Sequence, residues 1–288
     1  ACPAPTEGSA VNGFTMKGLA RGVALVGLAL LSIVGNAEER KEVVPDKDYD
    51  LPFPVGERLE YNITWGIISV AKSVATTEWI EEDGRILLRI EFRTKSNGYL
   101  KRIYPVNDTI ESIVDPETLL PIRFTKNMSE GRYRAHEVTT FDFEEGMATW
   151  ESKLSDKEKT YEINEETRDS VTFLYATRRH DTKENEIVEE EVMADEKIYD
   201  LRIKTKEVER VKLKEYGKVD SLKLEPQAEF QGIFVHKGEM EMWVSRDERR
   251  IFTKLMIDTP FANVRLKLNS VEGGPDDDWW DPPEQEGE

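Results

Sequence analysis

The sequence predicts a mainly β protein in which one large antiparallel sheet forms a closed or half-open barrel with one or two short helices. Three observations predict this fold. Apolar and polar residues alternate with a period of two along many segments, which is typical of strands with one buried face. Turn residues separate most of these segments. No internal repeat of roughly 20 to 50 residues is visible, which argues against a propeller or a solenoid.

The first strands follow directly from the alternation. Leu59, Tyr61, Ile63 and Trp65 alternate with polar residues, and a second alternating run covers residues 86–92. The acidic turn ahead of that run, Glu81-Glu82-Asp83-Gly84, predicts a hairpin with the preceding strand. Further strands are predicted at 106–114, 120–128, 132–143, 147–153, 186–194, 197–215, 218–225, 238–245, 250–257 and 262–271.

One segment departs from the period of two. Within residues 169–179, Val171, Leu174, Tyr175 and Arg178 are spaced as on one face of a helix, with an acidic residue at the start and basic residues at the end.

An open antiparallel sheet of about ten strands would leave unpaired edges, which proteins avoid. We therefore expect a barrel or half-barrel with a helix that covers one opening.

The ends of the chain differ in composition from its middle. Lys17 and Arg21 precede an apolar run, and Gly35-Asn36-Ala37 supplies the small residues of a signal-peptidase site. A transmembrane anchor is the alternative, but the apolar run is shorter than the about 20 residues that span a bilayer. The predicted divisions are 1–15, an upstream or misassigned segment; 16–37, a signal peptide; 38–50, a flexible segment; 51–272, a single β-rich domain; and 273–288, a disordered acidic tail.

These divisions predict an exported protein, periplasmic or associated with the outer envelope, without a transmembrane span after signal cleavage. The tail has no basic residue, and its composition cannot build a core. Its Trp279-Trp280 pair is either a docking motif for an envelope protein or an incidental aromatic pair in a solvated tail.

The charge balance limits the classes of partner. Forty basic and 58 acidic residues give a formal net charge of −18. Such a chain repels phosphate backbones, which argues against nucleic-acid binding, and the same net charge predicts repulsion from an anionic membrane surface. The only cysteine, Cys2, precedes the predicted cleavage site. The mature chain is therefore predicted to lack disulfides, thiolate nucleophiles and cysteine-ligated metals.

Several landmarks occur in the order typical of a known group. They are the segments 52–61, Trp65-Gly66, 103–108, 115–121, 129–133, Asp169-Ser170 with Leu174-Tyr175, 232–234 and 243–250. From about Phe53 to Val271 the chain resembles the exported bacterial family known as domain of unknown function 3108. Two departures concern a proline usual soon after the Asp-Glu-Arg-Arg run, where residues 251–253 stand, and a glycine near residues 261–262. The resemblance implies a β-rich exported fold, similar in outline to the unclosed barrels of periplasmic lipoprotein carriers, and no established activity.

Signatures of catalysis and of metal binding are absent from the sequence. The three histidines, His136, His180 and His236, form no HxH, HExxH or HxxE pattern. Serine-hydrolase, P-loop and dinucleotide-binding motifs are also missing. We therefore predict a protein that is not an enzyme and that carries no metal or cofactor.

Carboxylates beside apolar residues are the remaining polar candidates. The candidate polar cluster is Asp108, Glu130, Arg132, Asp169, Asp247 and Arg249. One interpretation is that the acids pair with Arg132, Arg178 or Arg249 and tie turns together. The other is that two of them form the acid and base of a glycosidase, which their spacing in sequence cannot reveal.

Five aromatic residues on predicted strands are candidates to line a ligand cavity: Tyr61, Trp65, Phe92, Phe234 and Trp243. They either fill the core or surround a space for an acyl chain. The leading hypothesis is an exported, non-enzymatic envelope protein that binds an apolar ligand, a lipid or a lipidated polypeptide, inside the barrel. The alternatives are an envelope scaffold or adaptor that binds a protein partner and a carboxylate-dependent polysaccharide hydrolase.

Overall fold

A computed structural model describes residues 43–98, 100–179, 181–194, 196–230, 233–234, 240–258 and 263–273, with only the backbone of 228–230 and 233–234. The predicted signal peptide, nearly all of the acidic tail, His180 and His236 lie outside these residues. The helices among the described residues are too short to cross a bilayer.

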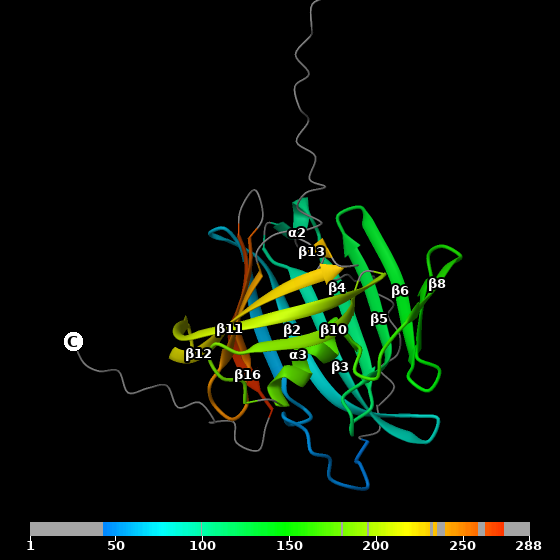
Figure 1. Cartoon of the computed structure of the whole chain (residues 1–288). Helices are drawn as coiled ribbons and strands as arrows, with labels where there is room; N and C mark the ends of the chain where they lie inside the picture. Colours follow the sequence, from blue (N-terminus) through cyan, green and yellow to red (C-terminus); the bar gives the residue numbers. More distant parts are fainter. Residues whose placement is uncertain are drawn as a thin grey trace, which may run out of the picture.

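Strands dominate the described chain (Figure 1). In chain order the elements are β1 (Arg58–Trp65), β2 (Ile68–Glu82), β3 (Arg85–Ser96), α2 (Leu100–Ile103), β4 (Asn107–Val114), β5 (Pro121–Glu130), β6 (Tyr133–Asp142), β7 (Met147–Ser152), β8 (Lys157–Glu162), β9 (Arg168–Asp169), α3 (Ser170–Ala176), the 3₁₀ helix η1 (Thr177–Arg179), β10 (Ile187–Ala194), β11 (Lys197–Leu213), β12 (Gly217–Phe230), β13 (Ile233–Phe234), β14 (Met240–Ser245), β15 (Phe252–Ile257) and β16 (Val264–Glu272).

All of these strands belong to one sheet, as the alternation predicts. Its order is β8-β7-β6-β5-β4-β3-β2-β1-β16-β15-β14-β12-β11-β10-β9, with β13 paired to β12. Strands β1 to β8 form a meander in which each strand is antiparallel to the next. The sheet does not close, because β8 and β9 are its two ends. The mainly β, half-open form of the prediction is therefore confirmed.

The two open edges of the sheet are protected in different ways. Strand β8 is almost entirely exposed and carries charged residues, and charge on an edge strand discourages pairing with other chains. Strand β9 has only two residues and leads directly into α3. The sequence analysis missed β8, because a strand exposed on both faces shows no apolar alternation.

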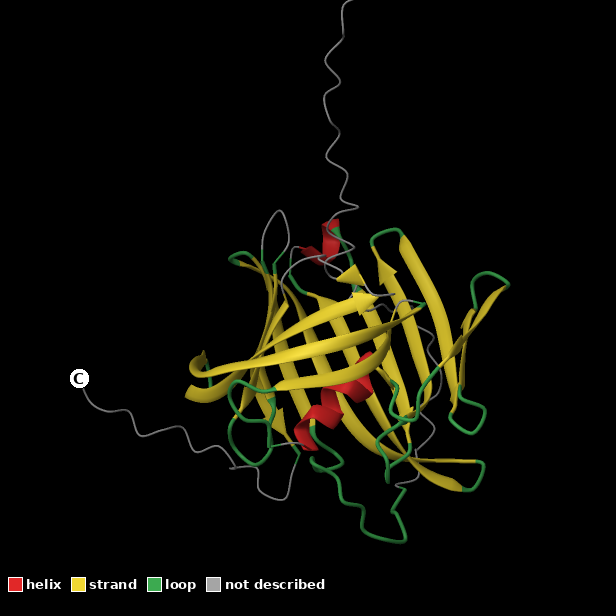
Figure 2. Ribbon diagram, viewed as in Figure 1, coloured by secondary structure: helices red, strands yellow, loops and turns green. Residues whose placement is uncertain are grey.

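Helix α3 fills the concave side of the curved sheet (Figure 2). Its Val171 and Tyr175 pack in a cluster with Leu88 and Ile90 of β3, whereas Phe173 packs in a separate cluster on β10, β11, β12 and β14. The helix thus contacts both halves of the sheet. The helical spacing within residues 169–179 predicted this helix correctly, but the helix packs on the concave face of the sheet, whereas the prediction placed it over one opening of a barrel.

The start of α3 is fixed by its first residues. Asp169 is the N-cap, and its Oδ1 accepts hydrogen bonds from the backbone N–H groups of Val171 at 2.7 Å and Thr172 at 2.8 Å. The Thr172 hydroxyl accepts from the Asp169 N–H at 3.0 Å, which completes a capping box. Ser112 of β4 donates to the other oxygen of Asp169 at 2.5 Å. One carboxylate therefore positions the helix and joins it to the facing strand.

Candidate functional site

The aromatic candidates lie mainly within packed clusters. Tyr61 and Trp243 belong to one buried core cluster, and Phe92 packs against it. Trp65 packs beside the cluster that contains Ile63. None of these four side chains lines either of the two cavities described below. The side chain of Phe234 lies outside the described part of the structure.

Asp108 and Glu130 are the only two acids of the polar candidates that the fold brings together. They lie on neighbouring strands, β4 and β5, and are 1% and 2% exposed. Burial raises the pKa of Asp108 to about 9, with a further contribution from Glu130, and burial raises the pKa of Glu130 to about 7. Asp108 Oδ1 accepts a hydrogen bond from the Ser129 N–H at 3.2 Å, whereas Asp108 Oδ2 and Glu130 Oε1 are buried without a hydrogen-bond partner among the described residues, which favours the protonated form of the pair.

The other polar candidates have separate structural surroundings. Asp169 caps α3, and burial raises the pKa of its carboxyl. Asp247 closes the turn after β14, where its Oδ1 accepts from the N–H groups of Arg249 at 3.0 Å and Arg250 at 3.3 Å. Arg132 is exposed in the β5–β6 turn. The four acids therefore do not converge on one cleft.

A buried ion-pair cluster joins three distant segments. Arg178 and Arg249, which the sequence analysis named as possible partners of the candidate acids, both pair instead with Glu57, a residue that it did not single out. Arg178 of η1 donates to both oxygens of Glu57, at 2.6 and 2.9 Å. Arg249 donates to the same carboxylate at 2.6 Å, and the Arg178 Nε donates to the Arg249 carbonyl at 2.9 Å. Glu57 precedes β1 within the segment that resembles the family. Its position gave no signal of burial, because it follows the turn glycine Gly56 and not an apolar run.

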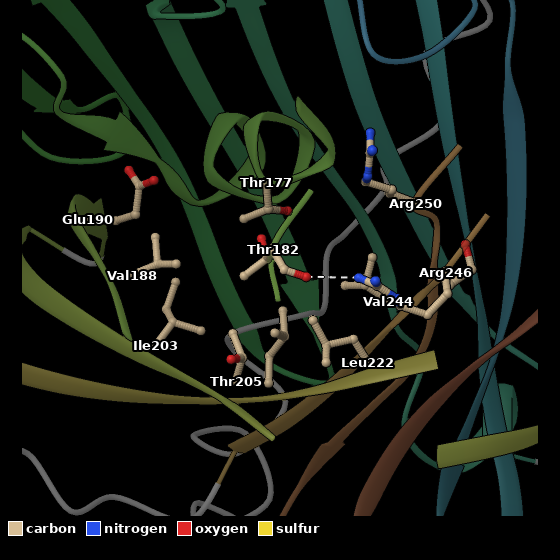
Figure 3. A pocket seen from close by; sticks show the side chains of 12 residues that line it. Thr177, Thr182, Val188, Glu190, Ile203, Thr205, Leu222, Val244, Arg246 and Arg250 are labelled. Atoms are coloured by element: carbon tan, nitrogen blue, oxygen red, sulfur yellow. Dashed lines mark hydrogen bonds between the residues drawn. The ribbon is translucent and has the colours of Figure 1, made fainter. Parts of the chain in front are cut away.

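The first cavity lies between η1 and the strands β10, β11, β12 and β14 (Figure 3). Aliphatic side chains gather at its centre: Val188, Ile203, Leu222, Leu224 and Val244. Thr177 and Thr182 close one side, and two arginines from the turn after β14, Arg246 and Arg250, lie at the rim. The sheet alternation places the aliphatic groups on one face, and the β14–β15 turn supplies the cations.

The two arginines at the edge of the first cavity form only weak ion pairs with a carboxylate. Arg246 lies 3.6 Å and Arg250 4.0 Å from Asp181, whose side chain is 66% exposed. Arg246 also donates to the Thr182 carbonyl at 2.8 Å, which Figure 3 marks, and Arg250 donates to the Arg178 carbonyl at 3.2 Å. Exposed ion pairs of this length contribute little, so both guanidinium groups have donors to offer to an anion.

A second cavity lies under the start of α3. Ile110, Phe124 and Phe141 form its apolar part, and an ion pair between Lys126 and Glu137, at 3.2 Å, forms its polar part. Each cavity holds about 40 Å³, which is enough for a few water molecules and well below the roughly 300 Å³ of a small-molecule pocket. A long ligand could enter only if α3 and η1 moved away from the sheet.

The described residues contain no group of three or more His, Cys, Asp and Glu side chains placed to hold a metal.

The family model described as protein of unknown function, DUF3108, matches residues 60–269, which is most of the chain. The chain belongs to the DUF3108 family. The resemblance drawn from the sequence landmarks is therefore confirmed, and the family match covers nearly the whole sheet of this DUF3108 protein.

Comparisons with individual proteins add information about the fold. No curated protein matches this DUF3108 chain. A β-barrel-like protein of the family DUF1849 from Brucella abortus has a crystal structure that matches with a TM-score of 0.50 and 10% identity, over 77% of this chain and 99% of that one. A protein from Parabacteroides distasonis, provisionally described as a lipoprotein, matches at 8% identity and a TM-score of 0.34 over 78% and 100% of the two chains, a likeness too weak to argue from. The first match supports a β-barrel-like architecture for this DUF3108 protein and says nothing of its activity.

Proposed function

We propose that this DUF3108 protein is a non-enzymatic envelope protein that binds the acyl chain of an acidic lipid in the cavity beneath η1. The observation that carries the proposal is the composition of this cavity, in which an aliphatic centre lies beside two arginines with weak partners. Apolar surroundings favour a hydrocarbon chain, and a pair of guanidinium groups favours a carboxylate or phosphate headgroup. The envelope location rests on the predicted signal peptide.

The size of the cavity requires a movement. At about 40 Å³ the cavity admits only the end of an acyl chain. A full ligand therefore displaces η1 and the end of α3 away from strands β10, β11, β12 and β14. The Glu57–Arg178–Arg249 cluster holds this end of the helix and opposes the movement. We therefore expect ligand uptake to be slow and to become faster when this cluster is weakened.

The geometry does not favour the polysaccharide hydrolase. A glycosidase needs two carboxyl groups that face one substrate, whereas here Asp169 caps α3 and Asp247 closes the turn after β14. The side chains of Asp108 and Glu130 are also buried, and neither lines either of the two cavities described above. The adaptor hypothesis remains a prediction, because the Trp279-Trp280 pair lies outside the described residues.

The test is binding of palmitate, compared with palmityl alcohol, followed by native mass spectrometry and by isothermal titration. Val188→Trp fills the cavity, and Ile187→Trp adds the same side chain at the exposed neighbouring position of β10. We expect palmitate to bind the wild type and the Ile187 variant in a 1:1 ratio, and Val188→Trp to bind at least tenfold more weakly. Replacing Arg246 and Arg250 by Gln should reduce the preference for palmitate over the alcohol.

Two results would contradict the proposal. One is wild-type protein that binds neither compound at saturating concentrations. The other is equal binding by the two tryptophan variants, with both folded as judged by circular dichroism. Binding of both compounds with the same affinity would keep the apolar site and remove the role of the two arginines.

A further inference from the structure

In the meander β1 to β8, the connections at one end of the strands are basic and the connections at the other end are acidic. Because each strand is antiparallel to the next, the β1–β2, β3–β4, β5–β6 and β7–β8 connections lie at one end of the sheet. We name residues 64–69, 95–106, 131–134 and 152–157 the basic rim. They contain seven basic residues and one acidic residue, a net formal charge of +6, in a chain of net charge −18.

The opposite end of the same strands is acidic. Its connections, residues 81–85, 115–118, 142–146 and 163–166, contain ten acidic residues and one basic residue, a net formal charge of −9. The β15–β16 connection joins the basic rim and adds the half-buried Asp258 among its described residues, which leaves the rim positive. The acidic charge of the whole chain is therefore not spread evenly, and the rim is a local positive surface.

Exposed apolar side chains gather on the same rim. The described structure has seven strongly exposed large apolar residues, and five of them lie there. These five are Ile67 at 100% exposure, Leu154 at 60%, Ile68 at 58%, Ile103 at 57% and Tyr133 at 47%. They lie in or beside four separate connections, all at the same end of the strands.

The cations beside these apolar side chains have no carboxylate partner among the described residues, although Arg134 donates to the carbonyls of Gly131 and Tyr133. Lys101, Arg102, Arg132 and Arg134 are exposed, and no carboxylate in the described part of the chain forms an ion pair with any of them. Surface charges act over about 8 Å at physiological ionic strength, so a partner at the rim meets the local positive charge and not the distant acidic end. The net charge alone predicted repulsion from anionic membranes, and the distribution of charge in the fold reverses that expectation for this surface.

We propose that the basic rim docks on the surface of an anionic lipid bilayer, with Ile67, Ile103 and Leu154 inserted at the headgroup level and the neighbouring lysines and arginines bound to lipid phosphates. Apolar tips flanked by cations are the combination that an anionic bilayer surface attracts, because insertion removes apolar area from water while the cations meet the negative surface potential. The acidic opposite end orients the molecule by repulsion from the same surface. The rim lies at the other end of β14 from the arginines of the cavity, so docking does not depend on ligand binding.

The experiment is flotation of the full chain with vesicles of phosphatidylcholine alone or with added phosphatidylglycerol. Two double variants are tested. The apolar rim variant carries both Ile67→Ser and Leu154→Ser, and the charge variant carries both Lys101→Gln and Arg102→Gln. Ile187→Ser is the apolar control on β10, and Arg210→Gln with Lys214→Gln on the β11–β12 hairpin changes the net charge equally. At low salt the charge variant should lose about 30-fold in affinity for anionic vesicles, while both controls bind as the wild type does.

The outcomes separate this proposal from the others. Raised salt should weaken binding of the wild type, and the Val188→Trp cavity variant should float with vesicles normally. Equal binding to neutral and anionic vesicles, or rim variants that bind as the wild type does, would overturn the proposal. Absent vesicle binding, combined with a protein partner lost in the Ile67 and Leu154 variant, would assign the rim to a protein interface and would also overturn it.

Discussion

Arg178 and Glu57, 121 positions apart in the sequence, form a bidentate ion pair in the interior of the protein. Their side chains are 2% and 0% exposed, and the guanidinium also lies over the rings of Phe53 at 5.2 Å and Tyr175 at 5.5 Å. The pair joins the residue before the first strand to the end of the interior helix. It therefore fixes how the helix sits over the sheet.

Removing one member of this pair should be costly. Arg178→Met leaves the Glu57 carboxylate buried with Arg249 as its remaining charged partner, and we expect a loss of about 3–5 kcal/mol in the free energy of unfolding, measured with urea. Arg210→Met breaks the exposed pair with Asp220 and should cost at most about 1 kcal/mol. If the two substitutions had equal cost, the buried cluster would not fix the helix.

The cap of α3 allows a graded test. Asp169→Ala removes the acceptor of two helix N–H groups and leaves the buried hydroxyl of Ser112 without its acceptor. We therefore expect the free energy of unfolding to fall by at least about 2 kcal/mol. Asp169→Asn keeps an acceptor for the helix and should lose less. Thermal unfolding of both variants, each with and without Ser112→Ala, measures how much of the cost comes from the bond to β4. An alanine variant as stable as the asparagine variant would contradict the capping role.

The Asp108–Glu130 pair predicts a pH dependence of stability. The folded-state pKa values, about 9 and about 7, lie above the ordinary carboxyl values near 4. Protonation therefore favours the folded state, so the stabilisation is complete below about pH 4 and is lost as the pH rises through 7 and 9. Asp108→Asn removes one of these groups, and the variant should gain stability relative to the wild type between pH 5 and pH 9.

Urea unfolding at a series of pH values measures this gain, which has an upper limit of about 1.4 kcal/mol per pH unit. Asp200→Asn, an exposed substitution on β11, is the control and should follow the wild type. Parallel pH profiles for Asp108→Asn and the wild type would show that the two carboxyl groups are not coupled in a buried site.

Two turn glycines provide a matched comparison. Gly131 and Gly84 both have positive φ, +55° and +73°, so alanine strains the backbone at both positions by about 1–2 kcal/mol. A Cβ at Gly131 would also lie 2.7 Å from Cε2 of Tyr104, whereas a Cβ at Gly84 meets no atom within 4 Å. Gly131→Ala should therefore be the more destabilising by about 1–3 kcal/mol, and Tyr104→Ala should remove this excess. Equal melting temperatures for the two alanine variants would contradict the close contact.

Much of the fold could be predicted because it depends on local periodicity. The alternation from Leu59 to Trp65 places one set of side chains toward the interior whatever the strand pairs with, and the predicted strands reproduce most observed strands to within a few residues. The spacing of Val171, Leu174 and Tyr175 likewise identified α3. Strand β8 was missed because it lies at an edge with both faces exposed.

The sequence by itself determined the fold class, the position of the interior helix along the chain and the membership of the family, since these depend on short-range patterns and on landmarks in order. Only the tertiary structure decided which charges meet. Glu57 finds Arg178 and Asp108 finds Glu130 because strand register and helix docking bring them together, and the aliphatic cavity beneath η1 arises between elements distant in sequence. The basic rim follows the same rule, because antiparallel pairing gathers every second connection at one end of the sheet, and the net charge of a chain carries no information about that separation.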